Sequence, residues 1–105
     1  MTTSEVFEKV LERPPMYVGH CSAIRILIFL EGYRYALLQA GTDPRDELYD
    51  GFQGWVAKRF DIKTMHDWAS IISFMSQSEL AAFEMTKDLW RKYKSEYEEA
   101  KDAKK

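Results

Sequence analysis

The stretch that decides the fold is Ser22–Ala40, SAIRILIFLEGYRYALLQA, the most continuously apolar segment of the chain. One set of its apolar side chains recurs at helical spacing, and a second set fills much of the remaining helix surface. The first set is Ile24, Leu27, Ile28, Tyr35 and Leu38, and the second is Ile26, Phe29, Leu30, Tyr33 and Leu37. A helix that is apolar nearly all round is normally surrounded by other elements. We therefore expect this helix at the centre of the fold.

This central segment carries helix signals at both ends. Ser22 suits an N-cap, because its hydroxyl can accept a hydrogen bond from a free backbone N–H, and Gly41 suits a left-handed C-cap. Gly32 lies in the middle and costs about 1 kcal/mol relative to alanine, which favours close approach of a neighbouring helix there. Three charged side chains and the short length argue against a membrane span.

The rest of the chain favours further helices. A short amphipathic segment capped by Thr3 or Ser4 comes first, and apolar spacing indicates helices at 48–60 and 65–75. A long last helix follows the capping-box pattern that begins at Ser76. No segment alternates in the manner of a strand. The sequence therefore predicts an all-α fold, a compact bundle of four to five helices around the central apolar helix.

Length and composition favour a single helical domain over residues 1–105. The chain is 46% hydrophobic, enough to fill a modest core, and residues 98–105 have nothing to bury and are expected to fray. The lone cysteine, Cys21, excludes an intrachain disulfide framework. Because the first residues also lack a secretion signal pattern, we expect a cytoplasmic protein.

The charge distribution disfavours nucleic acid as a partner. Residues 1–86 hold 8 basic and 12 acidic side chains, whereas residues 87–105 hold 7 basic and 5 acidic ones. A duplex-DNA binder usually presents a strongly basic surface. The three tryptophans follow helical spacing within apolar stripes, which predicts core positions instead of a base-stacking platform. An acidic body suits a protein partner, in particular a basic one.

The string at 13–19, RPPMYVG, is the most distinctive motif. Its two prolines predict an extended passage that ends the first helix. In one interpretation the strip anchors the chain against the central helix. In the other, Arg13, Tyr17 and His20 line a surface that receives a ligand or a partner, since Tyr and Arg combine large area with polar tips.

The same string resembles the Arg-Pro-x-Met-Tyr-x-Gly segment near the start of the gyrase B-type ATPases. Those enzymes hold Mg-ATP with an asparagine-bearing helix and a glycine-rich loop, whereas this chain contains no asparagine and no such loop. That activity is therefore rejected. The opening also resembles that of small bacterial proteins of similar size, some of which look like immunity partners of secreted toxins. This second resemblance implies an inhibitor-like role and assigns no individual residue.

Four carboxylates cluster before and within the third helical segment, namely Asp43, Asp46, Glu47 and Asp50. Solvation and helix capping explain such a cluster in structural terms, and two of the four could also form a general acid/base pair. In a third interpretation, they form an acidic surface with Glu12 and Glu31 that faces a basic toxin or nuclease. Complementary charge of this kind speeds association and selects partners.

Metal and thiol chemistry have weak support in the sequence. His20, Cys21 and His66 are the only imidazoles and thiol, and their spacing does not match a zinc site. A Cys21–His66 nucleophilic pair would require the fold to bring the two together. We therefore expect no metal and no cofactor.

These patterns together favour a non-enzymatic protein-binding module, a bacterial immunity protein that blocks a toxin by occlusion. The partner-binding residues predicted from the sequence are Arg13, Tyr17, His20, Asp43, Asp46, Glu47 and Asp50. The alternative is a small enzyme or ligand-binding protein with a pocket beside the Arg13–Cys21 strip. Surplus aromatic side chains on the last helix would also suit a homodimer.

Overall fold

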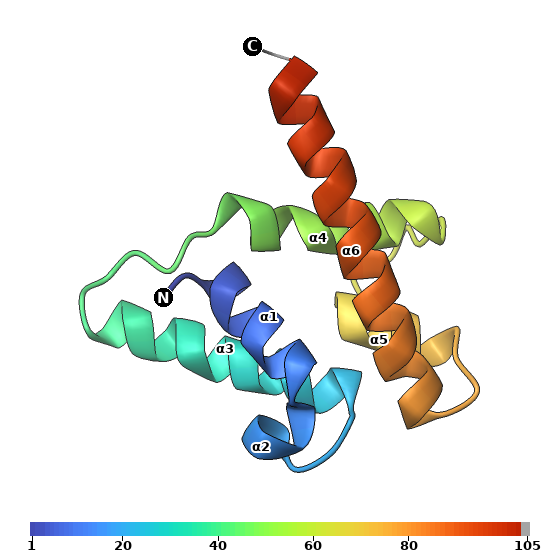
Figure 1. Ribbon diagram of the computed structural model, residues 1–105, viewed down its shortest axis with the longest axis horizontal. Helices are drawn as coiled ribbons and strands as arrows, with labels where there is room; N and C mark the ends of the chain where they lie inside the picture. The colour runs from blue at the N-terminus through green and yellow to red at the C-terminus, as the bar shows by residue number, and fades with distance from the viewer. Residues whose placement is uncertain (104–105) are drawn as a thin grey trace.

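The computed structural model describes residues 1–103 and is all-α over that range (Figure 1). Its helices are α1 (Thr3–Glu12), α2 (Pro14–Val18), α3 (Ala23–Gln39), α4 (Glu47–Arg59), α5 (Trp68–Phe74) and α6 (Glu79–Ala103). The predicted all-α class is confirmed. The described residues form six helices where the sequence predicted four to five, because the strip that was expected to be extended is itself helical.

The additional helix is α2, and its prolines explain why it forms. Pro14 and Pro15 occupy the first helical positions, where a missing N–H removes no intrahelical bond. Gly19 ends the helix with φ of 93°, in the left-handed region that glycine adopts without strain. The Arg25 guanidinium then donates to the Val18 carbonyl at 2.9 Å. The short helix is therefore held against the start of α3.

The core is centred on Phe7 of α1. Its ring lies 4.7 to 6.0 Å, between centroids, from four aromatic rings of α4, α5 and α6, namely Tyr49, Phe52, Trp68 and Trp90. All five side chains are buried, which confirms core positions for Trp68 and Trp90. The Trp68 indole N–H donates to the Tyr49 hydroxyl at 3.1 Å, and burial raises the pKa of Tyr49 to about 12.

Helix α4 is continuous although it contains two glycines, Gly51 and Gly54. Gly51 faces Tyr93 of α6, and a Cβ built on Gly51 would collide with the Tyr93 hydroxyl. That hydroxyl donates to the Leu48 carbonyl. Gly51 therefore lets α6 cross α4 closely, and the contact offsets the low helix propensity of glycine.

The later helices start at caps other than those the sequence indicated. Asp67 accepts from the Ser70 backbone N–H at 2.7 Å, so α5 begins at Trp68 instead of Met65. The Ser78 hydroxyl accepts from the Ala81 backbone N–H at 3.0 Å, so the cap predicted at Ser76 is wrong. Similarly, Thr2 caps α1 through a capping box instead of Thr3 or Ser4.

Helix α6 crosses α4 and α5, and its C-terminal turns extend away from the other helices at the top of Figure 1. The helix continues to Ala103, so 98–103 is helical where fraying was expected, and residues 104–105 lie outside the described range. Leu80 near its start is 59% exposed, although it precedes the buried Phe83 by three positions.

Helix α3 packs against α1, α2, α5 and α6, but on one side only. Its buried residues are Ala23, Ile26 and Leu30. The opposite side presents large apolar side chains to solvent, with Ile28 and Tyr35 each 64% exposed. The expectation that other helices surround α3 is therefore wrong for this side, because none of the helices within residues 1–103 covers it.

Candidate functional site

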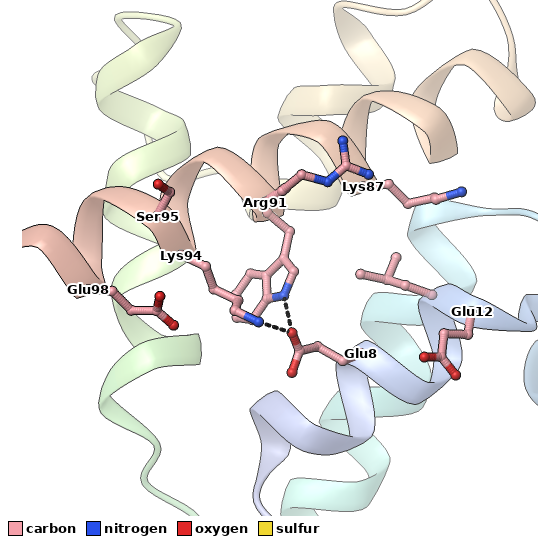
Figure 2. Close-up of a pocket in the computed structure, with 9 residues that line it drawn as sticks. Glu8, Glu12, Lys87, Arg91, Lys94, Ser95 and Glu98 are labelled. Atoms are coloured by element: carbon pink, nitrogen blue, oxygen red, sulfur yellow. Dashed lines mark hydrogen bonds and ion pairs between the residues drawn. The ribbon is translucent and has the colours of Figure 1, made fainter.

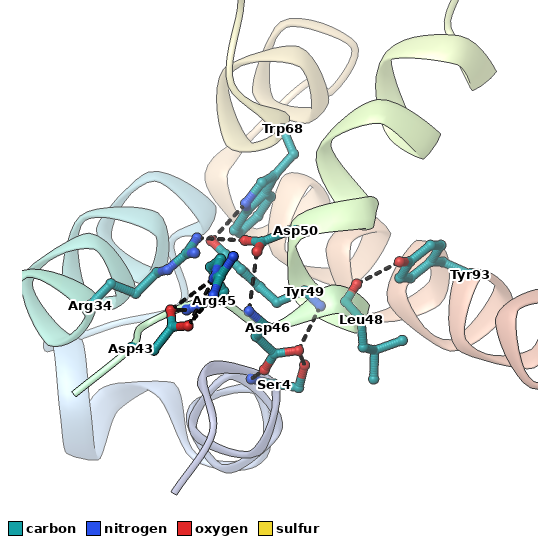
Figure 3. Close-up of polar contacts among 10 residues, drawn as sticks. All are labelled: Ser4, Arg34, Asp43, Arg45, Asp46, Leu48, Tyr49, Asp50, Trp68 and Tyr93. Carbon is teal, nitrogen blue, oxygen red and sulfur yellow. Dashed lines mark hydrogen bonds and ion pairs between the residues drawn. The ribbon is translucent and has the colours of Figure 1, made fainter. Parts of the chain in front are cut away.

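The predicted acidic residues form part of the structural framework around the start of α4 (Figure 3). Asp46 is the N-cap of α4 and accepts from the Tyr49 backbone N–H at 3.1 Å. It also accepts from the Ser4 backbone N–H at 2.7 Å and from the Ser4 hydroxyl at 2.8 Å. Desolvation raises the pKa of Asp46, but these hydrogen bonds together lower it below its ordinary value. The Asp46 carboxylate is therefore engaged in hydrogen bonds that join parts of the fold.

Two neighbouring carboxylates are also neutralised by arginines. Asp43 forms a bidentate pair with Arg45, and Asp50 pairs with Arg34 of α3 at 2.8 Å. Figure 3 shows both arginines among the acidic side chains. Glu47 is exposed in the first turn of α4. The four residues are thus brought together as predicted, but the surface they form is of mixed charge.

The predicted residues of the RPPMYVG strip lie around α2. Arg13 is exposed immediately before this helix, and Tyr17 is 40% exposed, with its ring edge against Phe29 of α3. His20 Nε2 lies 3.5 Å from the Glu79 carboxylate, which links the start of α3 to the start of α6. These contacts support the structural interpretation of the strip.

The outer face of α3 is the strongest candidate surface, and it contains none of the partner-binding residues predicted from the sequence. We define this face by its exposed apolar residues Ile24, Ile28, Tyr35 and Leu38, together with Gly32. The four apolar positions follow a helical spacing that places them on one side. Near the middle, a Cβ on Gly32 would have no atom within 4 Å. Among the described residues, no neighbouring helix therefore accounts for Gly32, contrary to expectation.

One charged residue lies within this row. Glu31 follows Ile28 by three positions and precedes Tyr35 by four, so it shares their side of the helix. Within residues 1–103 its carboxylate has no hydrogen bond or ion pair, whereas nearby Asp50 is paired with Arg34. The outer face of α3 thus combines exposed apolar area with an unpaired negative charge.

A small pocket of about 200 Å³ adjoins Glu31 between α3, α4 and α5. Its apolar and aromatic walls come from Leu27, Tyr49 and Trp68, and Gln53 also lines it. Its charged lining residues are Glu31, Asp50, Asp67 and Arg34, of which Asp50 pairs with Arg34 and Asp67 caps α5. A pocket of this size and charge suits a single cationic side chain.

A wider groove of about 590 Å³ lies between α1 and α6 (Figure 2). Lys87 and Arg91 follow its α6 side, and Glu8 and Glu12 follow its α1 side. Lys94 pairs with Glu8 across the two helices, and the Trp90 indole N–H points to the same carboxylate at 3.5 Å. The central charges of the groove therefore help to join α1 to α6.

His66 lines a separate, mostly apolar pocket of about 340 Å³ with Ile62, Ile71, Phe74 and Met75. Phe74 and Met75, at the end of α5, are 83% and 40% exposed. Cys21 is half-buried and lies two residues before the start of α3, and it does not line this pocket. Among the described residues, no group of three His, Cys, Asp or Glu side chains is placed to hold a metal ion.

Comparisons with known proteins place no further constraint on the site. No family model matches the chain, and neither the curated proteins nor the solved structures contain a significant match. Within residues 1–103, no helix combines the length and apolar character needed to cross a membrane.

Proposed function

We propose that this protein is a non-enzymatic protein-binding module whose docking surface is the outer face of α3. The observation that carries the proposal is the exposure of Ile28, Tyr35 and Leu38, at 64%, 64% and 59%, on one side of one helix. Contiguous exposed apolar side chains of this kind mark interaction sites, whereas scattered ones need no explanation.

The residue types on this face support a protein partner. Tyr35 offers a large ring with a polar tip, a combination enriched among the residues that dominate binding energy. Isoleucine and leucine side chains beside it supply apolar area without any group suited to chemistry. In its specific form, the proposal is that the module neutralises a toxin by occluding it, as the resemblance of the RPPMYVG opening implies.

The proposal is tested by affinity capture from the native host with three purified baits, the wild type, Ile28→Asp and Met65→Asp. Met65 is fully exposed and lies in the connection before α5, so it is a matched control outside the face. We expect a protein that the wild type and Met65→Asp retain and that Ile28→Asp loses. A capture pattern that is the same for all three baits would contradict the proposal.

A ligand-binding protein is the second candidate function, and the α1–α6 groove is the observation that favours it. Its volume of about 590 Å³ falls within the range of small-molecule sites. The test is a thermal-shift screen with amino acids and short peptides, whose charged ends match the two sides of the groove. A shift in the wild type that Arg91→Ala abolishes would favour this function.

A further inference from the structure

We propose that the partner of the outer face of α3 is an amphipathic helix that carries a lysine or arginine opposite Glu31. This inference rests on the proposed function and names the chemistry of the partner. It follows from three features of the face, which are its length and shape, the position of Gly32, and the unpaired carboxylate.

The shape of the face suits a helix. The row from Ile24 to Leu38 follows one side of α3 over 15 residues, whose 14 steps of 1.5 Å span about 21 Å. Because α3 offers no free backbone groups along this row, an added strand would find no hydrogen bonds. A partner helix can instead set its own apolar row against these side chains.

Gly32 supplies a point where two helices can cross. It lies between Ile28 and Tyr35 on the outer face, and the space above it is empty within 4 Å of a Cβ position. A residue without a side chain lets a neighbouring backbone approach closely. The crossing would leave Ile28 on one side of the contact and Tyr35 on the other.

The charge of the face selects a basic partner. Glu31 lies one residue before the crossing point, and within residues 1–103 it pairs with no other charge. Beside it, the pocket lined by Glu31, Asp50 and Asp67 against Arg34 alone provides space for a cationic side chain. A lysine or arginine of the partner would pair with Glu31 while its methylene groups contact Leu27 and Trp68.

The same charge disfavours a second copy of this chain. An antiparallel two-fold pairing about Gly32 would bring Glu31 next to Glu31 of the other copy, because each residue meets its own symmetry mate near the axis. Like charges placed together oppose association. The basic helix is therefore the occupant that the face fits best.

Two synthetic 18-residue helical peptides test this inference against the full chain. They share one leucine-rich apolar face and differ only in a central lysine or glutamate on that face. Binding is measured by fluorescence anisotropy, and the contact surface is mapped by backbone amide chemical shifts. We expect the lysine peptide to bind at least about tenfold more tightly than the glutamate peptide, with shifts along α3.

Three variants make the result specific. Ile28→Asp is expected to abolish binding of the lysine peptide. Glu31→Lys is expected to reverse the preference between the peptides, whereas Glu99→Lys, the same charge change on the exposed end of α6, is expected to preserve it. Equal affinity for the two peptides, or no binding of either, would overturn the basic-helix partner.

The remaining outcome separates this inference from the proposed function. Self-association of the wild type that Ile28→Asp abolishes would identify a second copy as the occupant. That result would overturn the basic partner while retaining the outer face of α3 as the docking surface. Failure of the proposed function would appear instead in the affinity capture from the host, if Ile28→Asp retained the same proteins as the wild type.

Discussion

The carboxylate of Asp46 accepts two hydrogen bonds from Ser4, 42 residues earlier, at 2.7 Å from the backbone N–H and 2.8 Å from the hydroxyl. The Ser4 N–H belongs to the first turn of α1, where backbone N–H groups lack intrahelical partners. Asp46 also caps α4 by accepting from the Tyr49 backbone N–H. One carboxylate therefore accepts hydrogen bonds from backbone N–H groups at the starts of two helices (Figure 3). This contact fixes how α1 and α4 meet.

Removing this carboxylate is expected to weaken the fold substantially. Asp46→Ala should lower the free energy of unfolding by about 2 kcal/mol, because it removes a helix cap and two charge-assisted hydrogen bonds. The measurement is equilibrium unfolding in urea. Asp43→Ala is the control, since the Asp43–Arg45 pair is exposed and its loss should change stability much less than the loss of Asp46. Equal losses for both variants would contradict the role of Asp46.

The same carboxylate should make stability depend on acid. The hydrogen bonds from Ser4 and Tyr49 hold the pKa of Asp46 below its ordinary 3.8. Its stabilising effect is therefore complete above that value and is lost as the pH falls through the lower pKa of the folded state. Unfolding measured between pH 5 and about pH 2 should show a smaller acid-induced loss in Asp46→Asn than in the wild type. Glu47→Gln is the control, and it should lose as much stability in acid as the wild type does.

The two glycines of α4 are expected to respond oppositely to alanine. Gly51→Ala should destabilise the protein by about 1 kcal/mol or more, because the new methyl group displaces the Tyr93 hydroxyl. Gly54→Ala should stabilise it by about 0.5 to 1 kcal/mol, since a Cβ there meets no atom within 4 Å. Urea unfolding measures both. The penalty at Gly51 should shrink in a Tyr93→Phe background, and an unchanged penalty would exclude the hydroxyl as its cause.

Gly32 is expected to be unnecessary for folding. Gly32→Ala should raise the free energy of unfolding by up to about 1 kcal/mol, because the position is helical and open. The same variant should weaken binding of the lysine peptide, since a methyl group keeps the two helices apart. A loss of stability in thermal unfolding would mean that Gly32 serves an intrachain contact instead.

Most of the fold is predictable from the sequence, because the spacing of apolar residues indicates where most of the helices lie. The buried aromatic side chains Phe52, Trp68 and Trp90 all lie on predicted apolar stripes. The caps are harder to predict, since several serines, threonines and aspartates compete near each helix start. Asp67 caps α5 where Gln53 of α4 donates to the His66 carbonyl and accepts from the Trp68 backbone N–H, and short-range patterns do not contain these tertiary contacts.

The candidate surface is predictable only in part. The apolar circumference of α3 is evident in the sequence, but which side is buried depends on how many helices the chain can place around it. Ile26 and Leu30 are covered, while Ile28 and Tyr35 are not, although all four are apolar. The acidic residues near α4 attract notice in the sequence because Arg34 of α3 meets Asp50 only in the folded chain, although Arg45 lies two residues after Asp43.

The central claim is that the outer face of α3 is free in the folded chain and available to a partner. The most direct measurement is the free energy of unfolding of Ile28→Gln against that of Ile26→Gln, two identical changes on opposite sides of one helix. We expect Ile28→Gln to remain within about 0.5 kcal/mol of the wild type, and Ile26→Gln to lose about 3 kcal/mol or more. A loss of several kcal/mol for Ile28→Gln would contradict the account, because it would place that side chain in the core.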